Sequence, residues 1–191
     1  MMGLDPSVFL IGQGVKSPWY VGNTARGLLE RFGEARVIDT PVSENGITGA
    51  AVGAAIAGMK PVVVHPRMDF MLFAMDPIIN HAANWHYMNG GRGSVPVVFW
   101  GIINRGGAQG AQHSQAIHAL FASVPGLKVV MPATAYDAKG LMIAAIRDAN
   151  PVVFVDERRL YRLEDAVPEE VYGVEIGKGC VRREGKDVTV V

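Results

Sequence analysis

Apolar runs rich in Val and Ile alternate along this chain with longer segments of helical pattern. Buried strands are predicted over residues 60–65, 95–100, 128–131 and 152–155, with a shorter run at 36–39. Helical patterns cover residues 46–59, 70–88, 114–123 and 135–149. Continuous apolar strands separated by helices are typical of a parallel sheet covered on both faces. The pattern therefore predicts an α/β fold, a three-layer doubly wound parallel sheet.

The character of the chain changes after Asp156. Residues 1–156 are predicted to form one domain. Residues 157–175 are charged and are interrupted by Pro168 and Gly173, which indicates a linker over the surface. Residues 179–191 have the pattern of a hairpin or of a first strand, and the chain ends inside an apolar run. We therefore expect residues 157–191 to be a linker plus the first strand of a missing C-terminal domain.

Composition excludes several classes of protein. The 191 residues include 18 basic and 18 acidic side chains, so the zero net charge gives no sign of a nucleic-acid or anionic-membrane partner. A single cysteine excludes an internal disulfide framework and a Cys-based zinc cluster, and it indicates a reducing compartment. The stretch from Gly46 to Met59 is shorter than the ~20 residues that span a membrane. A soluble, cytoplasmic protein is expected.

Three polar segments follow predicted strands, at residues 40–45, 65–70 and 104–114. Ligands of open α/β sheets bind beyond the carboxyl ends of the strands, so these segments are the candidates for chemistry. Glu44 begins a helical pattern. It is either a first-turn carboxylate favoured by the helix dipole or a carboxylate in an apolar cleft that shares a proton with a ligand. Its position alone leaves both interpretations open.

Other candidates are equally ambiguous when taken singly. His113 is either a hydrogen-bonded structural histidine or a catalytic one, and Phe70 is either a core residue or the support of a flat ligand ring. No histidine pair has the i,i+4 spacing of metal ligands, and no G-x-S-x-G or phosphate-binding glycine motif occurs. The glycines within residues 46–58 each cost a helix about 1 kcal/mol. They indicate a close approach to the sheet or to a second chain.

Taken together, long motifs of this sequence resemble one family, the beta subunit of thiamine-diphosphate-dependent 2-oxo acid dehydrogenases of the pyruvate, branched-chain and acetoin type. This beta subunit carries the pyrimidine-binding domain shared with transketolases. The resemblance runs from about residue 26 to the end. The matching segments are residues 36–49 (RVIDTPVSENGITG), 51–59, 75–80, 87–91, 111–115 (AQHSQ), 125–130, 137–141 and 145–153.

The resemblance implies roles for named residues. Glu44 matches the glutamate that hydrogen-bonds a ring nitrogen of the cofactor's aminopyrimidine and, by sharing a proton there, promotes the imino tautomer. Phe70 matches the aromatic residue packed against that ring, and His113 matches the histidine that faces the substrate. A monovalent-cation site, expected to hold potassium, is matched by a small set of positions: Val97, Ala145, Asp148 and Asn150.

The resemblance also implies partners. The family's diphosphate and magnesium ligands lie in a G-D-G motif on another domain, and this sequence has no G-D-G. An alpha-type subunit is therefore expected to hold thiamine diphosphate through magnesium, and a lipoyl acyltransferase to accept the acyl group. The small-residue helix and the long apolar helix indicate self-association.

Two departures leave other functions open. Trp100 stands where the family's strand-end motif has an arginine, and Arg105 is a candidate to replace that charge. The C-terminal domain that the resemblance implies is expected to be missing beyond its first strand. A split transketolase or decarboxylase subunit, and a non-catalytic scaffold with the same fold, remain as alternatives to a 2-oxo acid dehydrogenase subunit.

Overall fold

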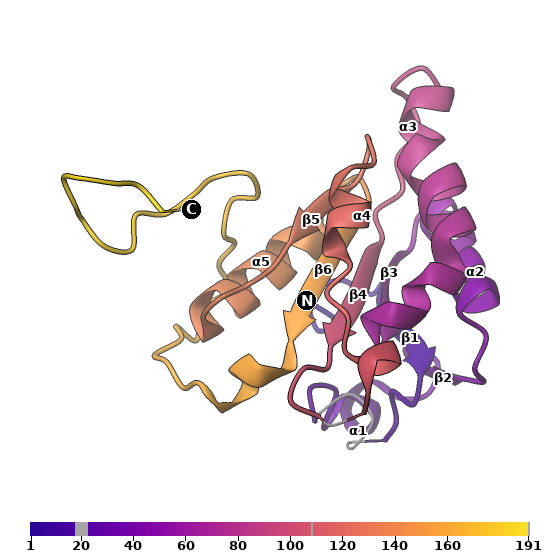
Figure 1. The fold of residues 1–191 in the computed structure, drawn as a ribbon. Helices are drawn as coiled ribbons and strands as arrows, with labels where there is room; N and C mark the ends of the chain where they lie inside the picture. The colour runs from indigo at the N-terminus through magenta and orange to yellow at the C-terminus, as the bar shows by residue number, and fades with distance from the viewer. Residues whose placement is uncertain (18–22, 108, 191) are drawn as a thin grey trace.

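The computed structural model describes residues 1–17, 23–107 and 109–190, which build a six-stranded, wholly parallel sheet (Figure 1). The strand order is β2-β1-β3-β4-β6-β5. The strands are β1 (Val8–Gln13), β2 (Val37–Thr40), β3 (Lys60–His65), β4 (Val98–Ile103), β5 (Lys128–Val130) and β6 (Val152–Glu157). The predicted α/β class with a doubly wound parallel sheet is confirmed.

Two strands differ from the predictions. β1 is buried along its whole length and lies between β2 and β3, yet its apolar run was not predicted as a strand. β4 begins at Val98 instead of residue 95, because Pro96 has no N–H to give to a neighbouring strand and the N–H of Val97 bonds to the carbonyl of Val95.

The helices connect these strands. They are α1 (Leu28–Phe32), α2 (Glu44–Ile56), η1 (Met68–Ala74), η2 (Asp76–Ala83), α3 (Asn84–Met88), η3 (Ala111–His113), α4 (His118–Ala122), α5 (Ala135–Arg147) and η4 (Arg158–Arg162). The end of α2 is set by Gly58, whose φ of 96° is left-handed, and the start of α5 by Thr134, whose hydroxyl oxygen accepts a bond from the Asp137 N–H.

The prediction of one continuous helix over residues 70–88 is wrong, because the segment is divided into three helices of different type. The segment is a 3₁₀-helix, then a π-helix, then a short α-helix, and Pro77, which has no N–H, stands where the first type gives way to the second. The helix predicted over 114–123 is shorter as well. The backbone N–H of Gln115 bonds to the Asp69 carboxylate instead of to a helical carbonyl, so the α-helix begins only at His118.

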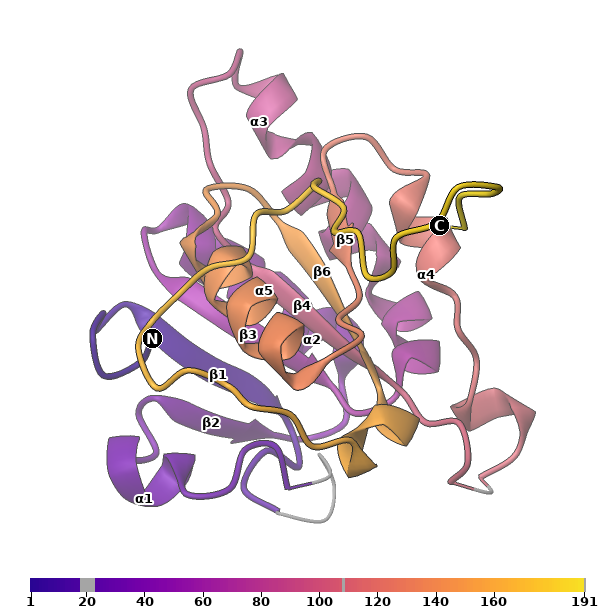
Figure 2. The same ribbon diagram turned by 90° about the vertical axis from the view of Figure 1, so that its left-hand side faces the viewer.

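Each face of the sheet has its own apolar layer. One face is covered by α2, η1, η2 and α4, and Phe99 of β4, Met71 of η1 and Phe121 of α4 are fully buried between these helices and the sheet. The other face is covered by α5 and by α1 (Figure 2). Three layers are therefore present, and the carboxyl ends of the strands lie at one edge between them.

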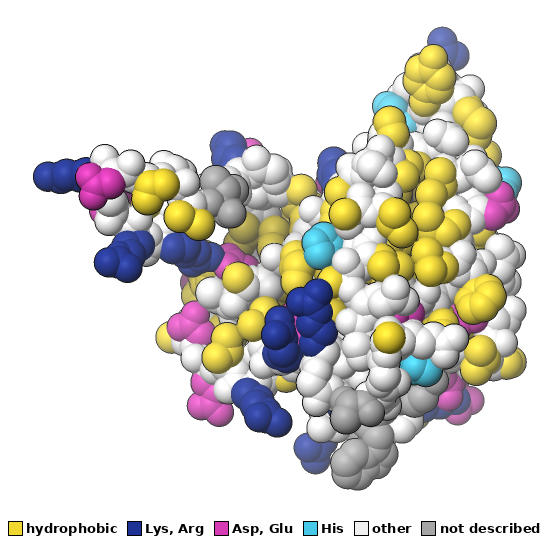
Figure 3. Space-filling view, viewed as in Figure 1, with side chains coloured by type: hydrophobic (Ala, Val, Ile, Leu, Met, Phe, Trp, Pro, Cys, Tyr) yellow, Lys and Arg dark blue, Asp and Glu magenta, His cyan; other side chains and the backbone are white. Residues whose placement is uncertain are grey.

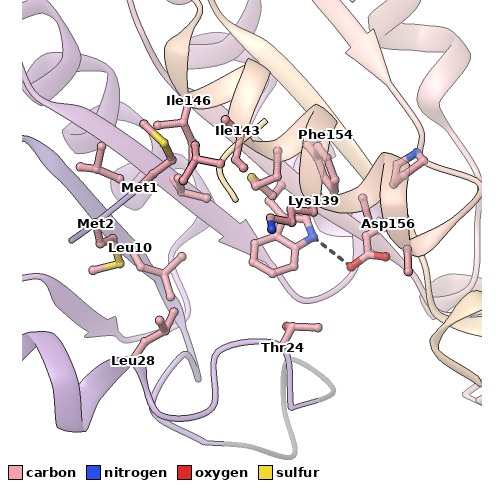
Figure 4. Close-up of a pocket in the computed structure, with 18 of the residues that line it drawn as sticks. Met1, Met2, Leu10, Thr24, Leu28, Lys139, Ile143, Ile146, Phe154 and Asp156 are labelled. Atoms are coloured by element: carbon pink, nitrogen blue, oxygen red, sulfur yellow. Dashed lines mark hydrogen bonds between the residues drawn. The ribbon is translucent and has the colours of Figure 1, made fainter. Parts of the chain in front are cut away.

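A cavity of about 960 Å³ lies on the second face, between α1 and α5 (Figure 4). Apolar side chains such as Leu10, Ile143 and Phe154 line it. Trp100 donates a hydrogen bond from Nε1 to Asp156 Oδ2 at 3.2 Å in this cavity, and burial raises the pKa of the Asp156 carboxyl. Because neighbouring strand residues face opposite sides, Trp100 is turned away from the layer that contains α2 and η1.

The C-terminal segment leaves the sheet after η4. Residues 163–190 contain no helix or strand within the described chain, so the hairpin expected at 179–191 is not seen there. The segment first runs along α5, where the N–H of Val174 bonds to the carbonyl of Gly140 (3.1 Å) and the Tyr172 hydroxyl bonds to the Tyr136 carbonyl (2.8 Å). A linker over the surface with the first strand of a further domain stays a prediction, since a lone strand has no neighbour to pair with here.

Replacement of Gly12 by Ala is expected to destabilise the fold. A Cβ there would lie 2.5 Å from the carbonyl oxygen of Val64 on the neighbouring strand, and this backbone contact cannot relax without separating β1 from β3. Gly53→Ala is the matched control: nothing lies within 4 Å of its Cβ, so the helix should gain about 1 kcal/mol. Urea unfolding checks both changes. Equal stability of the two variants would contradict this assignment.

Candidate active site

The polar segments predicted from the sequence meet at one edge of the sheet. β2, β3 and β4 are parallel, so Glu44, the segment at 65–70 and the loop at 104–114 all leave the same, carboxyl edge. A small pocket at this edge is formed by β1, α2 and the segment after β3; its lining residues are Gln13, Glu44, Ile47, Val64, His65, Pro66, Arg67 and Phe70.

Glu44 and Phe70 are brought together by this pocket. Glu44 is the first residue of α2, where the helix dipole favours a carboxylate, and its side chain remains partly exposed. The pocket measures about 10 Å³, roughly the space of one water molecule. The pocket of the chain by itself is therefore too small to enclose a ring.

His113 reaches the same place from the loop after β4. Its ring lies edge-on to the Phe70 ring, with centroids 5.1 Å apart and planes at 88°. Phe70 is thus shared: it lines the pocket with Glu44 and contacts His113. The three candidate residues, which are separated by 26 and 43 positions in the sequence, lie in one continuous patch.

Two buried residues support this patch and were missed by sequence reasoning. Thr48, one turn beyond Glu44 on α2, contacts His65 through a hydrogen bond of 3.2 Å between Oγ1 and Nε2. Burial lowers the pKa of His65 to about 4, so the ring is neutral at pH 7. The bond ties the first turns of α2 to the end of β3. The sequence shows His65 at the end of an apolar run, but Thr48 lies 17 residues away and no local pattern identifies it as the partner.

Trp100 and Arg105 do not contribute to this patch. Trp100 lies against Phe154 on the opposite face of the sheet, with ring centroids 6.4 Å apart, and Arg105 is exposed at the start of the following loop. The strand alternation explains the placement of Trp100. A tryptophan at this position, where the resemblance led us to expect an arginine, therefore lines the cavity on the second face and not the patch of Glu44, Phe70 and His113.

The four positions predicted for a monovalent cation lie at the other edge of the sheet. Val97 precedes β4, and Ala145, Asp148 and Asn150 belong to the end of α5 and the turn after it. The Asp148 carboxylate is already paired with Lys128, at 2.5 Å between Oδ2 and Nζ. The carbonyl oxygens of Val97 and Ala145 each accept a backbone hydrogen bond, from Val152 and Asp148. The cation site stays a prediction.

With its three-layer sheet and the patch at the carboxyl edge, the chain belongs to the family described as "Transketolase, pyrimidine binding domain", which residues 1–164 match. The solved structure "Split gene transketolase, inactive beta4 tetramer" has the same fold, with a TM-score of 0.71 over 97% of this chain and 56% of that chain. Its sequence identity is 22%, so this likeness concerns the fold alone.

Sequence identity to the beta subunits of pyruvate and acetoin dehydrogenases is higher than the 22% identity to the split-gene transketolase. The chain is 47% identical over 193 residues to the pyruvate dehydrogenase E1 component subunit beta-2, mitochondrial, of Oryza sativa subsp. japonica, covering 99% of this chain and 51% of the relative. It is 44% identical over 200 residues to the beta subunit of acetoin:2,6-dichlorophenolindophenol oxidoreductase of Cupriavidus necator, covering 100% and 59%. The predicted resemblance to these beta subunits is confirmed.

These relatives are longer than this chain, which spans about half the length of the plant pyruvate dehydrogenase beta subunits that it matches. No helix in the described part of the chain is long and apolar enough to cross a bilayer. The rice relative is named as mitochondrial, and the predicted cytoplasmic location of this chain stays a prediction.

The buried His65 predicts a pH-dependent stability. The unfolded chain has a histidine pKa near 6.5, whereas the folded pKa is about 4, so the unfolded state binds more protons between these values. The free energy of unfolding should fall by about 3 kcal/mol from this group as pH drops from about 6.5 to 4. His65→Gln should remove that contribution, while Thr48→Val, which keeps His65 buried, should retain it. Urea unfolding at several pH values measures the difference; parallel pH profiles for wild type and His65→Gln would contradict the assignment.

Proposed function

We propose that this chain supplies the pyrimidine-binding half of the active site of a thiamine-diphosphate-dependent 2-oxo acid dehydrogenase, in the manner of a beta subunit. The observation that carries the proposal is the convergence of Glu44, Phe70 and His113 at the carboxyl edge of the sheet. The identity of 44–47% to pyruvate and acetoin-type beta subunits supports it. The substrate is a 2-oxo acid, decarboxylated oxidatively with transfer of the acyl group to lipoamide.

Each of the three residues fits a distinct task. Thiamine diphosphate, when bound, supplies the carbanion and the electron sink for loss of carbon dioxide. Glu44 would accept and return a proton at a ring nitrogen of the aminopyrimidine, for which its place at the pocket wall is suited. Phe70 would pack against the flat ring, and His113, whose ring abuts Phe70, would orient the substrate and stabilise developing charge.

Because the pocket is open to solvent, a second polypeptide would be needed to close it. Glu44 is partly exposed and the space beside it is small, so this chain would gain a closed, dry site only on association. An alpha-type subunit would close it and would hold the diphosphate and magnesium. The acceptor of the acyl group would be a lipoyl acyltransferase, and a potassium ion at the carbonyl oxygens near Asp148 would have a structural role.

The surface supports such an assembly. Hydrophobic side chains gather between α4 and the η2–α3 segment (Figure 3). The large exposed hydrophobics in this region and on η1 are Leu72, Phe73, Tyr87, Met88 and Leu120. Contiguous apolar surface of this kind is typical of protein–protein interfaces. A Cβ at Gly49 or Gly53 would meet nothing within 4 Å, so these two positions leave room for the approach of a second chain, which is the proposed role of the small-residue helix.

Replacement of Glu44 by Gln tests the proposal most simply. In the enzyme assembled with an alpha-type subunit, the variant keeps the shape of the side chain but cannot exchange a proton, so the turnover of 2-oxo acids should fall by about 10²- to 10⁴-fold. Decarboxylation assays with thiamine diphosphate and magnesium measure the loss.

Glu34→Gln is the matched control for that change. Glu34 is a 78% exposed glutamate that pairs with Lys16 on the surface, so its replacement should leave turnover unaltered. Full activity of Glu44→Gln would refute the proposed role. Turnover of ketose phosphates in place of 2-oxo acids would favour the split-transketolase alternative, and folded, assembled protein with no turnover of either would favour the scaffold.

A further inference from the structure

Asp69 is a buried carboxylate for which the proposed function has no task. It lies in η1 beside Phe70 and is only 4% exposed. Its Oδ1 accepts two hydrogen bonds from Gln115, one from the backbone N–H at 3.0 Å and one from the side-chain amide at 2.9 Å. Its Oδ2 has no hydrogen-bond partner within the described part of the chain. A buried carboxylate held in this way calls for an explanation, because desolvation makes it costly.

The loop that Asp69 contacts is the one that carries His113. Before His113, Gln109 accepts hydrogen bonds from Arg67 Nε at 2.7 Å and from Asn104 Nδ2 at 2.8 Å. After His113, the loop is held by Asp69. The histidine therefore lies between two anchors, and the short segment after β3 contributes to both. The bond from Arg67 is exposed to water, whereas Asp69 acts from the low-dielectric interior, where hydrogen bonds are stronger.

Apart from these anchors, the hydrogen bonds next to His113 in the described chain are long, and Ser114 Oγ donates one of them to the Asn104 carbonyl oxygen at 3.4 Å. The helix around it, η3, has only three residues, and the backbone N–H of His113 makes a long bond of 3.3 Å to the carbonyl of Gly110. Residues 114–117 form neither helix nor strand. We infer that Asp69 is a positioning residue, which clamps the loop so that the His113 ring stays against Phe70 and faces the substrate. The effect of this clamp on catalysis rests on the proposed function of His113. The clamp itself rests only on the hydrogen bonds between Asp69 and Gln115.

The loop needs an acceptor oxygen and not a negative charge. Asparagine has the same shape as aspartate and keeps one oxygen in place for both bonds from Gln115, whereas alanine has none. Asp69→Asn should therefore keep His113 in place, and Asp69→Ala should release it. Arg67→Gln, which alters the exposed anchor on the same segment, is the matched control and should have a much smaller effect.

Nuclear magnetic resonance of the His113 ring protons in the full chain, without partner or cofactor, tests the clamp. In wild type these protons should show the ring-current shift of Phe70, and Phe70→Leu gives the value without it. Asp69→Asn and Arg67→Gln should keep the wild-type shift, and Asp69→Ala should approach the Phe70→Leu value. A wild-type shift in folded Asp69→Ala would overturn the inference. If Asp69→Ala does not fold, Asp69→Leu takes its place, because leucine is similar in size and also gives the two Gln115 donors no acceptor oxygen. A reduced shift is expected, and an unchanged shift in the folded variant would contradict the clamp.

The assembled enzyme gives a second, separate readout. Loss of alignment at His113 should lower kcat of Asp69→Ala by about 10- to 100-fold with a smaller change in KM, and Asp69→Asn should restore it. A kcat of Asp69→Ala equal to that of wild type would overturn the positioning role. If the wild-type assembly does not decarboxylate 2-oxo acids at all, the proposed function fails, while the resonance of His113 still decides whether Asp69 holds the loop.

Discussion

The parallel arrangement of β2, β1, β3 and β4 side by side in one sheet is the constraint on which the rest of the structure depends. Parallel strands deliver their carboxyl ends to one edge, so the chain turns into α2, into η1 and into the loop before η3 at neighbouring points. Glu44, Phe70 and His113 belong to these three turns. Their closeness follows from the direction of the strands, and buried polar contacts such as Thr48 with His65 then fix how each turn leaves the sheet.

The same geometry leaves the candidate site open on one side. The edge that carries Glu44 and Phe70 is open to solvent, and the pocket there holds about one water molecule. Proton exchange between a carboxylate and a heterocycle works best where water is excluded, because electrostatic interactions are then stronger. A second polypeptide over the edge would provide that exclusion. The large apolar cavity between α1 and α5 lies on the second face of the sheet and is not lined by Glu44, Phe70 or His113.

The sequence pattern predicts the fold class well, because continuous Val- and Ile-rich runs leave few alternatives to a buried parallel sheet. It predicts less where the local signal is mixed: β1 went unpredicted, and residues 70–88 change helix type around Pro77. Glu44, Phe70 and His113 could be assigned only through resemblance, since each has a structural interpretation of its own. The hydrogen bonds of Asp69 and Thr48 could not be predicted from the sequence, because their partners lie 46 and 17 residues away and no periodicity connects them.

We propose above all that this chain binds the aminopyrimidine ring of thiamine diphosphate only together with a partner subunit that binds the diphosphate. Calorimetric titration of thiamine diphosphate and magnesium into the chain alone, and into its purified complex with an alpha-type subunit, tests it directly. We expect no measurable binding to the chain alone and saturable binding to the complex. Tight binding by the isolated chain, or a stable complex that does not bind the cofactor, would contradict the account.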